Sequence, residues 1–225
     1  AVAVSSGTAA LDIAIKSLNL KEGDEIIVPN FTIISCINEI IKQKLIPVFI
    51  DADINTWNID LNKIQKKITK KTKAILIVHI YGLPVDMDKV TKLVKKNNLF
   101  LIEDAAEQLG QKYFKKPIGS FGDISTFSFF ANKHITTGEG GMLVTDNKSL
   151  YKKFLSYRNI CFDLKKPRFV HDEIGWNYRL TSLQASLGIS QLKKLNKFIK
   201  IKKNIGKIYH KNFSDIKCFQ LPLKK

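Results

Sequence analysis

Short apolar runs that alternate with longer helical patterns constrain the fold of this chain most strongly. We expect strands at Glu25–Val28, Pro47–Asp51, Ala74–His79, Leu99–Glu103, Ile124–Phe127 and Gly141–Thr145. Strands that are apolar without interruption are buried on both faces, which is typical of a parallel sheet. Helical patterns occur at Thr8–Leu18, Ile33–Gln43, Asp60–Lys67, Asp86–Asn97 and Ser149–Tyr157. The sequence therefore predicts an α/β fold with a mainly parallel sheet flanked by helices.

The pattern changes after the last of these elements. Leucines recur from Leu180 to Leu195 with the spacing of one amphipathic helix, which we expect to run toward Lys202 and out of the sheet domain. We therefore assign residues 1–180 to a large α/β domain, and residues 181–225 to a linking helix and the start of a C-terminal domain. Both ends look incomplete, because a candidate ligand loop already lies at the start of the chain. We expect a fragment that lacks its N-terminal part and most of a small C-terminal domain.

The composition of the chain limits which binding partners and which cellular compartment we expect. The 37 basic and 20 acidic side chains give a net charge of +17, which permits nucleic-acid binding. The lysines are spread along predicted helices without interleaved aromatic residues, so we expect a solvated surface and no nucleic-acid partner. Three widely spaced cysteines fit neither a disulfide framework nor a zinc site and favour a reducing cytoplasm. We find no secretory signal, no membrane-spanning run and no metal-ligand pattern.

A first group of polar residues opens the helix predicted after residue 7. In open α/β sheets, ligands bind beyond the carboxyl ends of the strands. Ser6, Gly7 and Thr8 stand at a helix start, where free backbone N–H groups and the helix dipole favour an anion. The sequence predicts a phosphate site here, but an ordinary N-cap made by Ser6 or Thr8 explains the same residues.

A carboxylate follows the strand predicted at Leu99–Glu103. Asp104 in that position is compatible with a metal ligand, a helix cap or the partner of a protonated ring nitrogen. Pyridoxal phosphate needs the last of these, because a nearby carboxylate keeps its pyridine ring protonated and able to accept electrons. The small residues Ala105 and Ala106 leave room for a flat ring, so we prefer Asp104 to Glu103 for this role. The helix cap stays open as an alternative.

The segment Phe127–Gly141 places one lysine, Lys133, among mainly apolar and small residues. Such surroundings favour the neutral amine, which is the nucleophile and the general base that Schiff-base chemistry requires. Ser128 lies five residues earlier and can offer its hydroxyl to a phosphate. The alternative is one more surface lysine in a lysine-rich chain, which fits this lysine-poor segment less well.

Five ordered blocks of the chain resemble the DegT/DnrJ/EryC1/StrS sugar aminotransferases, which have the type I fold of pyridoxal-phosphate enzymes. The blocks are Ser6–Leu11, Gly23–Pro29, His79–Asp88, Phe127–Gly141 and His171–Leu180. The ordered set is far more specific than any single block. It implies that residues 1–180 form the cofactor-binding domain of a pyridoxal 5'-phosphate enzyme.

The resemblance implies a role for each matching residue. Lys133 would carry the cofactor as an internal aldimine and move protons during the reaction. Asp104 would pair with the pyridine nitrogen. The backbone at Gly7 and Thr8, together with Ser128, would hold the phosphate.

Four further positions are assigned to the cofactor by the same resemblance. Ser6 belongs to the phosphate loop, and Ile33 covers the ring at a position where the family often has an aromatic residue. Glu107 lies near the ring, where the family often has Gln or His. Asn177 would reach the phosphate of the cofactor in a neighbouring subunit, so the resemblance implies a homodimer.

Within the family, Glu107 and the segments Thr136–Gly141 and His171–Leu180 look most like the GDP-perosamine synthase branch. Enzymes of that branch transfer an amino group from glutamate to the nucleotide-sugar GDP-4-keto-6-deoxymannose. The related 3-dehydratases have histidine in place of the Schiff-base lysine, whereas this chain has Lys133. The resemblance therefore implies transamination of a nucleotide-linked 4-keto-6-deoxy sugar. The short length leaves an alternative, an inactive truncated relative that keeps only the cofactor pocket or the dimer surface.

Overall fold

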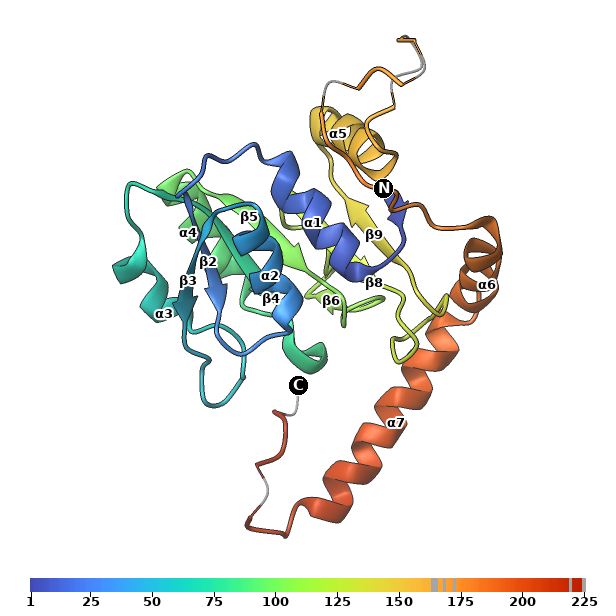
Figure 1. Ribbon diagram of the computed structural model, residues 1–225. Helices are drawn as coiled ribbons and strands as arrows, with labels where there is room; N and C mark the ends of the chain where they lie inside the picture. Colours follow the sequence, from blue (N-terminus) through green and yellow to red (C-terminus); the bar gives the residue numbers. More distant parts are fainter. Residues whose placement is uncertain (163–165, 168, 172, 219, 224–225) are drawn as a thin grey trace.

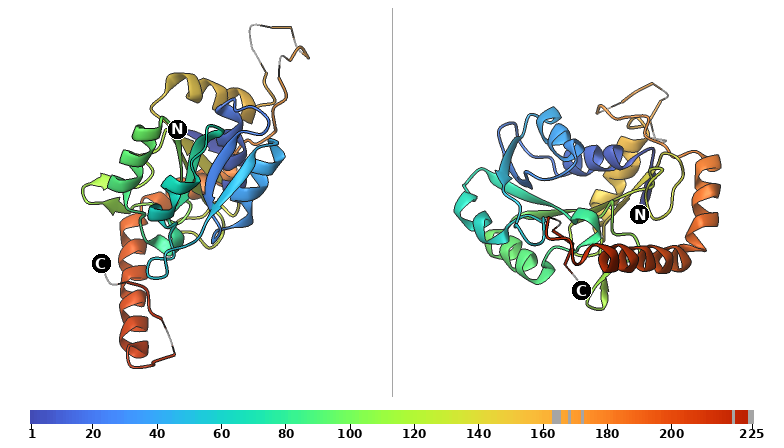
Figure 2. Two further views of the ribbon diagram at one scale, coloured as in Figure 1. Left: turned by 90° about the vertical axis from the view of Figure 1, so that its left-hand side faces the viewer. Right: turned by 90° about the horizontal axis from the view of Figure 1, so that it is seen from below.

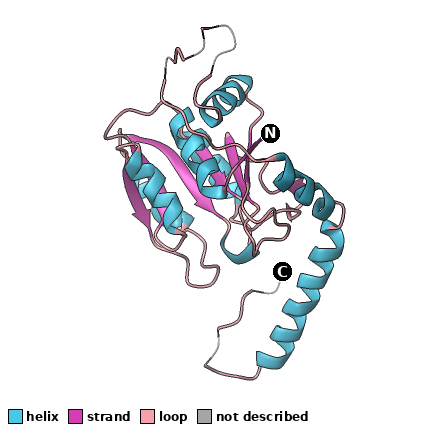
Figure 3. Ribbon diagram, turned by 45° about the vertical axis from the view of Figure 1, so that its right-hand side comes forward, coloured by secondary structure: helices cyan, strands magenta, loops and turns pink. Residues whose placement is uncertain are grey.

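A seven-stranded sheet with helices on both faces forms the body of the chain (Figures 1 and 3). The computed structural model describes residues 1–162, 166–167, 169–171, 173–218 and 220–223. Asp172, which belongs to the block His171–Leu180, lies outside the described residues.

The strands of the sheet run in the order β1-β9-β8-β5-β4-β2-β3. They are β1 (Val2–Val4), β2 (Glu25–Pro29), β3 (Ile46–Ile50), β4 (Thr72–Val78), β5 (Phe100–Asp104), β8 (Ile124–Ser128) and β9 (Gly141–Val144). The pairs β3–β2, β2–β4, β4–β5 and β5–β8 are parallel. Strand β9 runs antiparallel to both β8 and β1. The predicted α/β fold with a mainly parallel sheet is confirmed.

Helices cover both faces of this sheet. Those that contribute buried side chains to one face are α1 (Gly7–Ser17), α2 (Ile34–Lys42) and α5 (Lys148–Arg158). The other face is covered by α3 (Leu61–Ile64), which continues into the 3-10 turn η1 (Gln65–Lys67), and by α4 (Met87–Asn97). A 3-10 turn, η2 (Ile80–Gly82), and a small hairpin of β6 (Lys112–Tyr113) and β7 (Lys116–Pro117) lie in the connections.

Neighbouring residues of one strand are buried on opposite faces, which explains the uninterrupted apolar runs. In β2, Ile26 and Val28 belong to the hydrophobic cluster under α1 and α2, whereas Ile27 belongs to the cluster under α4. Strand β4 divides in the same way, with Leu76 on the first face and Ile75 on the second. Each such side chain contributes roughly 1.5–3 kcal/mol when fully buried, so burial on both faces stabilises the sheet strongly.

Two helix starts follow the sequence closely. Ser6 caps α1 and its hydroxyl accepts the N–H of Ala9, and Asp86 caps α4 by accepting the N–H of Lys89. In contrast, α2 begins after Ile33, whose side chain makes no cap hydrogen bond.

The prediction of one helix from Leu180 toward Lys202 is wrong. The chain forms two helices, α6 (Ser182–Leu192) and α7 (Leu195–Phe213), which are separated at Lys193 and Lys194. The leucine spacing continues across this break, so periodicity does not reveal the turn, where Lys194 has a ψ of 4°. Helix α7 extends away from the sheet (Figure 2). No helix in the described part of the chain combines the length and apolar character needed to cross a membrane.

Candidate active site

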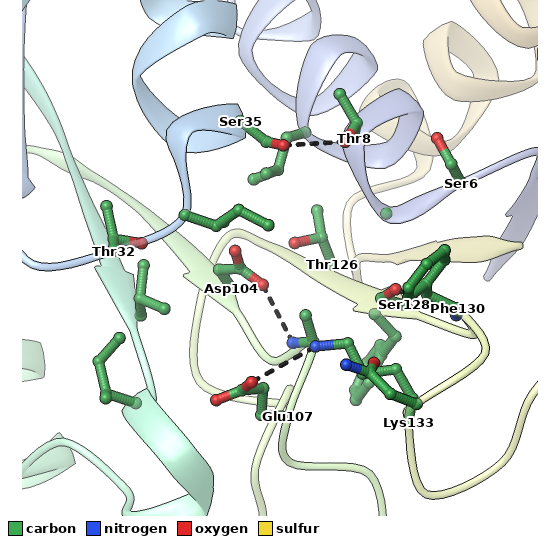
Figure 4. A pocket seen from close by; sticks show the side chains of 18 of the residues that line it. Ser6, Thr8, Thr32, Ser35, Asp104, Glu107, Thr126, Ser128, Phe130 and Lys133 are labelled. Carbon is green, nitrogen blue, oxygen red and sulfur yellow. Dashed lines mark hydrogen bonds and ion pairs between the residues drawn. The ribbon is translucent and has the colours of Figure 1, made fainter. Parts of the chain in front are cut away.

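A cavity of about 590 Å³ lies where the carboxyl ends of β4, β5 and β8 meet the first turns of α1 and α2 (Figure 4). A cavity of this size accommodates a small organic ligand. Eight predicted site residues line it: Ser6, Gly7, Thr8, Ile33, Asp104, Glu107, Ser128 and Lys133. The other predicted residue, Asn177, is exposed outside this cavity, where its side chain accepts a hydrogen bond from Arg179 Nε at 3.0 Å.

The first turn of α1 forms one wall of the cavity. The Ser6 hydroxyl is occupied by the N–H of Ala9 at 3.0 Å, so the N-cap explanation is right for this side chain. The backbone of Gly7 and Thr8 belongs to the same turn, whose first N–H groups have no partner within the helix. A Cβ on Gly7 would lie 2.9 Å from Cβ of Ser128, so only glycine lets α1 begin directly against the end of β8.

Asp104 lies at the end of β5 with 3% of its surface exposed. Its Oδ1 accepts the N–H of Ala106 at 3.0 Å, and its Oδ2 accepts the thiol of Cys36 at 3.4 Å. Burial raises the pKa of Asp104, while these two donors and the nearby His79 and Lys133 act to lower it. No helix begins after Asp104, so the helix-cap alternative is wrong. The carboxylate is instead held in one orientation on the cavity wall.

Lys133 lies on the opposite side of the cavity from α2, in the loop between β8 and β9 (Figure 4). Its Nζ is 3.4 Å from Oε1 of Glu107, and the two side chains are 19% and 34% exposed. The other oxygen of Glu107 accepts the backbone N–H of Tyr81 at 2.7 Å. The expectation of mainly apolar surroundings for Lys133 is therefore wrong in one respect, because a carboxylate faces the amine. Sequence could not place this pair, whose members are 26 positions apart.

Several residues of the cavity were not predicted. Ser35 joins Thr8 through their hydroxyl oxygens at 3.0 Å and thereby connects α2 to α1. Thr126 lines the cavity with a buried hydroxyl that has no partner among the described residues. It lies two positions before Ser128 on β8, and strand periodicity places both side chains on one face. That spacing is the sequence signal that identifies Thr126.

Comparison with known proteins places this geometry in a family. The profile of the DegT/DnrJ/EryC1/StrS aminotransferase family matches residues 1–225. The chain is 48% identical over 216 residues to a GDP-perosamine synthase of Escherichia coli O157:H7 and 41% identical over 216 residues to one of Vibrio cholerae. In both comparisons 96% of the chain is covered, and it spans 59% of the length of each relative.

Solved structures agree with these relatives. PseC of Helicobacter pylori, an aminotransferase in the biosynthesis of pseudoaminic acid, superimposes with a TM-score of 0.90 and 34% identity. That match covers 96% of the chain and 58% of PseC. A GDP-4-keto-6-deoxy-D-mannose-3-dehydratase of E. coli, solved with bound hydrated pyridoxal phosphate, gives 0.89 and 33%, covering 96% of the chain and 61% of the dehydratase. The fold is thus that of pyridoxal-phosphate aminotransferases, and pyridoxal phosphate is the cofactor of the family.

Proposed function

We propose that this chain, which belongs to the DegT/DnrJ/EryC1/StrS aminotransferase family, transfers an amino group from glutamate to a nucleotide-linked 4-keto-6-deoxy sugar with the help of pyridoxal phosphate. The observation that carries the proposal is the arrangement of the cavity. Lys133, the buried carboxylate of Asp104 and the first turn of α1 face one space. An amine, a carboxylate and an anion site in this arrangement match the aldehyde, the ring nitrogen and the phosphate of the cofactor.

The residues of the cavity fit pyridoxal phosphate. There is no room for a side chain at position 7 beside Ser128, so the start of α1 lies close to the Ser128 hydroxyl. A helix start next to a hydroxyl suits a phosphate group. The buried hydroxyl of Thr126 has no partner among the described residues and offers a hydrogen bond to a ligand in the cavity. Asp104 presents a carboxylate whose orientation is already fixed by two donors. Bound pyridoxal phosphate supplies an aldehyde for attachment of an amine and a protonated ring that accepts electrons.

Lys133 has two tasks in this proposal. Its Nζ would hold the cofactor through the aldehyde and, once displaced by the amine of the substrate, would act as the base that moves a proton at the substrate carbon. Glu107 accepts a hydrogen bond from Nζ of Lys133, which holds the amine at the cavity. The net reaction converts glutamate to 2-oxoglutarate and the keto group of the sugar to an amine.

A homodimer is part of the proposal. Asn177 is exposed and does not line the cavity, so it is available to a second copy of the chain. In that arrangement its amide reaches the phosphate bound by the first turn of α1 in the neighbouring copy. Cys36, Cys161 and Cys218 form no disulfide, which suits the reducing cytoplasm in which nucleotide-sugars are made.

Two observations favour an amino transfer to a GDP-linked sugar. The perosamine synthases are among the most similar relatives, with 48% identity for the E. coli protein. The chain has lysine rather than histidine at position 133, which favours amino transfer over the dehydration that gives the E. coli neighbour its name. The alternative expected from the sequence, an inactive relative that keeps only the cofactor pocket or the dimer surface, predicts no amino transfer.

The glutamate half of the reaction tests the proposal without any sugar. Protein loaded with pyridoxal phosphate is mixed with glutamate, and 2-oxoglutarate is measured together with the loss of the visible cofactor band. We expect one equivalent of 2-oxoglutarate per site. In a second step GDP-4-keto-6-deoxymannose is added, and we expect its conversion to the corresponding amino sugar. A folded, cofactor-loaded chain that releases no 2-oxoglutarate would instead support the inactive relative.

A further inference from the structure

We propose that Cys36 is a positioning residue, whose thiol holds the carboxylate of Asp104 in the orientation that the cofactor ring requires. The inference rests on the proposed function, because it assigns Asp104 to the pyridine nitrogen. Cys36 lies on α2, 68 positions before Asp104, and is completely buried.

Two hydrogen bonds fix the direction in which the S–H group of Cys36 points. The Thr32 hydroxyl donates to Sγ of Cys36 at 3.5 Å, so the sulfur acts as acceptor for that contact. The S–H of Cys36 then donates to Oδ2 of Asp104 at 3.4 Å. An ionised carboxylate only accepts, so this second contact requires a protonated thiol.

The environment of Cys36 keeps the thiol protonated. Burial raises the pKa of Cys36 well above its ordinary value, and the negative charge of Asp104 raises it further. Both effects favour the protonated thiol, which is the form that can donate to Asp104. This behaviour separates Cys36 from a reactive cysteine, whose thiolate is stabilised by nearby positive charge.

Each oxygen of Asp104 has its own donor. Ala106 N–H binds Oδ1, and the thiol of Cys36 binds Oδ2, so rotation of the carboxylate would break one contact. Burial raises the pKa of Asp104, and the thiol opposes that rise together with Ala106 N–H, His79 and Lys133. Loss of the thiol leaves Oδ2 buried without one of its donors and shifts the carboxyl toward its protonated form.

The same contact also fixes the start of α2. The residue before this helix, Ile33, makes no side-chain cap hydrogen bond. Two side-chain contacts join the first turn to other elements, from Ser35 to Thr8 on α1 and from Cys36 to Asp104 on β5. Ile33 lines the cavity directly before this turn, so the thiol of Cys36 helps to place both Ile33 and the carboxylate of Asp104.

A double-mutant cycle on cofactor affinity tests the inference. The dissociation constant of pyridoxal phosphate is measured by titrating cofactor-free wild type, Cys36→Ala, Asp104→Asn and the double variant. Cys36→Ala is expected to weaken binding about tenfold in the wild type, as loss of a hydrogen bond to a charged group does. In the Asp104→Asn background the same change should alter affinity by less than about twofold. Equal weakening in both backgrounds shows a packing role and overturns the inference.

Two further readouts separate positioning from stability. Cys36→Ser keeps a donor and should recover affinity to within about threefold of wild type. The affinity gap between wild type and Cys36→Ala should widen as pH falls, because Asp104 takes up a proton at higher pH without the thiol. A gap that is independent of pH contradicts the proposal.

A cofactor-free arm keeps the result distinct from the proposed function. Thermal unfolding of the same four proteins without cofactor measures whether Cys36 and Asp104 are coupled in the chain itself. If Cys36 and Asp104 are coupled in unfolding but wild type binds no cofactor, the proposed function and the positioning role are both wrong, although the hydrogen bond between the two residues exists. Absence of coupling overturns the inference even if wild type binds the cofactor and reacts with glutamate.

Discussion

Glu107 contacts Lys133 with one carboxylate oxygen, at 3.4 Å from Nζ, and accepts the N–H of Tyr81 with the other at 2.7 Å. Tyr81 has a left-handed backbone with a φ of 49°. That conformation costs a non-glycine residue about 1–2 kcal/mol, which the hydrogen bond helps to offset. One side chain therefore links the turn after β4 to the lysine of the cavity.

Substitutions of Glu107 should separate its two contacts. Glu107→Gln retains an oxygen for Tyr81 N–H and loses only the charge that faces Lys133, so we expect a loss of less than about 0.5 kcal/mol in the free energy of unfolding. Glu107→Ala removes both contacts and should cost about 1–2 kcal/mol. Urea unfolding of the cofactor-free proteins measures both values. Equal losses for the two variants would show that the Tyr81 contact contributes nothing.

Replacement of Asp104 should affect catalysis more than cofactor binding. Asp104→Asn has nearly the same shape but no charge, so it no longer favours the protonated ring. The groups expected to hold the phosphate, on α1 and at Ser128, are unchanged, so the protein should still bind pyridoxal phosphate, with an affinity reduced about tenfold by loss of the charge beside the ring. We expect the rate of 2-oxoglutarate formation from glutamate to fall on the order of 100-fold, the effect of removing one preorganised group at a reacting centre. Stopped-flow measurement of that half-reaction decides, and an unchanged rate would remove Asp104 from the mechanism.

The close approach of α1 to β8 predicts a specific effect at Gly7. A Cβ at this position would lie 2.9 Å from Cβ of Ser128, so Gly7→Ala must push the helix start away from the phosphate site. We expect pyridoxal phosphate to bind at least about tenfold more weakly, with a loss of about 1–3 kcal/mol in stability.

Gly206 provides the matched control for that substitution. It lies within α7, and an added Cβ there meets no atom within 4 Å. Gly206→Ala should leave cofactor affinity unchanged and stabilise the helix by about 0.5–1 kcal/mol. Similar affinities for Gly7→Ala and wild type would show that the phosphate does not bind at this helix start.

The pH dependence of stability should report on Glu39, which lies buried beside Asp12 and Lys42. Burial, reinforced by the charge of Asp12, raises the pKa of Glu39 from 4.5 to about 7, although Lys42 acts in the opposite direction. Because the folded chain holds a proton that the unfolded chain releases, the stabilising contribution is complete below pH 4.5 and is lost as pH rises through about 7.

The corresponding measurement compares wild type with Glu39→Gln by urea unfolding. Between pH 4.5 and 7 the free energy of unfolding of wild type should fall relative to the variant by roughly 1–3 kcal/mol. Below pH 4.5 the difference in the free energy of unfolding between the two proteins should stay constant. A constant difference between pH 4.5 and 7 would show that Glu39 is ionised throughout.

The sequence predicts the sheet well because most of its strands are buried on both faces and read as apolar runs. Ile26–Val28 and Ala74–Val78 are examples, since both faces of the sheet take side chains from them. Strand β1 has only three residues and pairs antiparallel with β9, so its apolar signal is too short to recognise. The break at Lys193 and Lys194 escapes detection because hydrophobic spacing continues through it.

The residues of the candidate site also fall into two groups, those that the sequence can identify and those that it cannot. Residues whose chemistry is local, such as Gly7 at a helix start and Asp104 at a strand end, can be found from position and residue type. Contacts between distant segments cannot, because they depend on how the elements pack. The thiol of Cys36 against Asp104 and the carboxylate of Glu107 against Lys133 are of this kind.

Lys133 is the proposed attachment point of pyridoxal phosphate. One experiment tests this assignment: the visible absorption of purified protein that has been incubated with pyridoxal phosphate and freed of unbound cofactor, before and after borohydride, followed by peptide mass analysis. Wild type and a control variant at an exposed lysine outside the cavity, Lys148→Ala, should show a band that borohydride removes, with the cofactor mass on the peptide that contains Lys133. Lys133→Ala should show neither. A folded wild type without the band, or a Lys133→Ala variant that keeps it, would contradict the account.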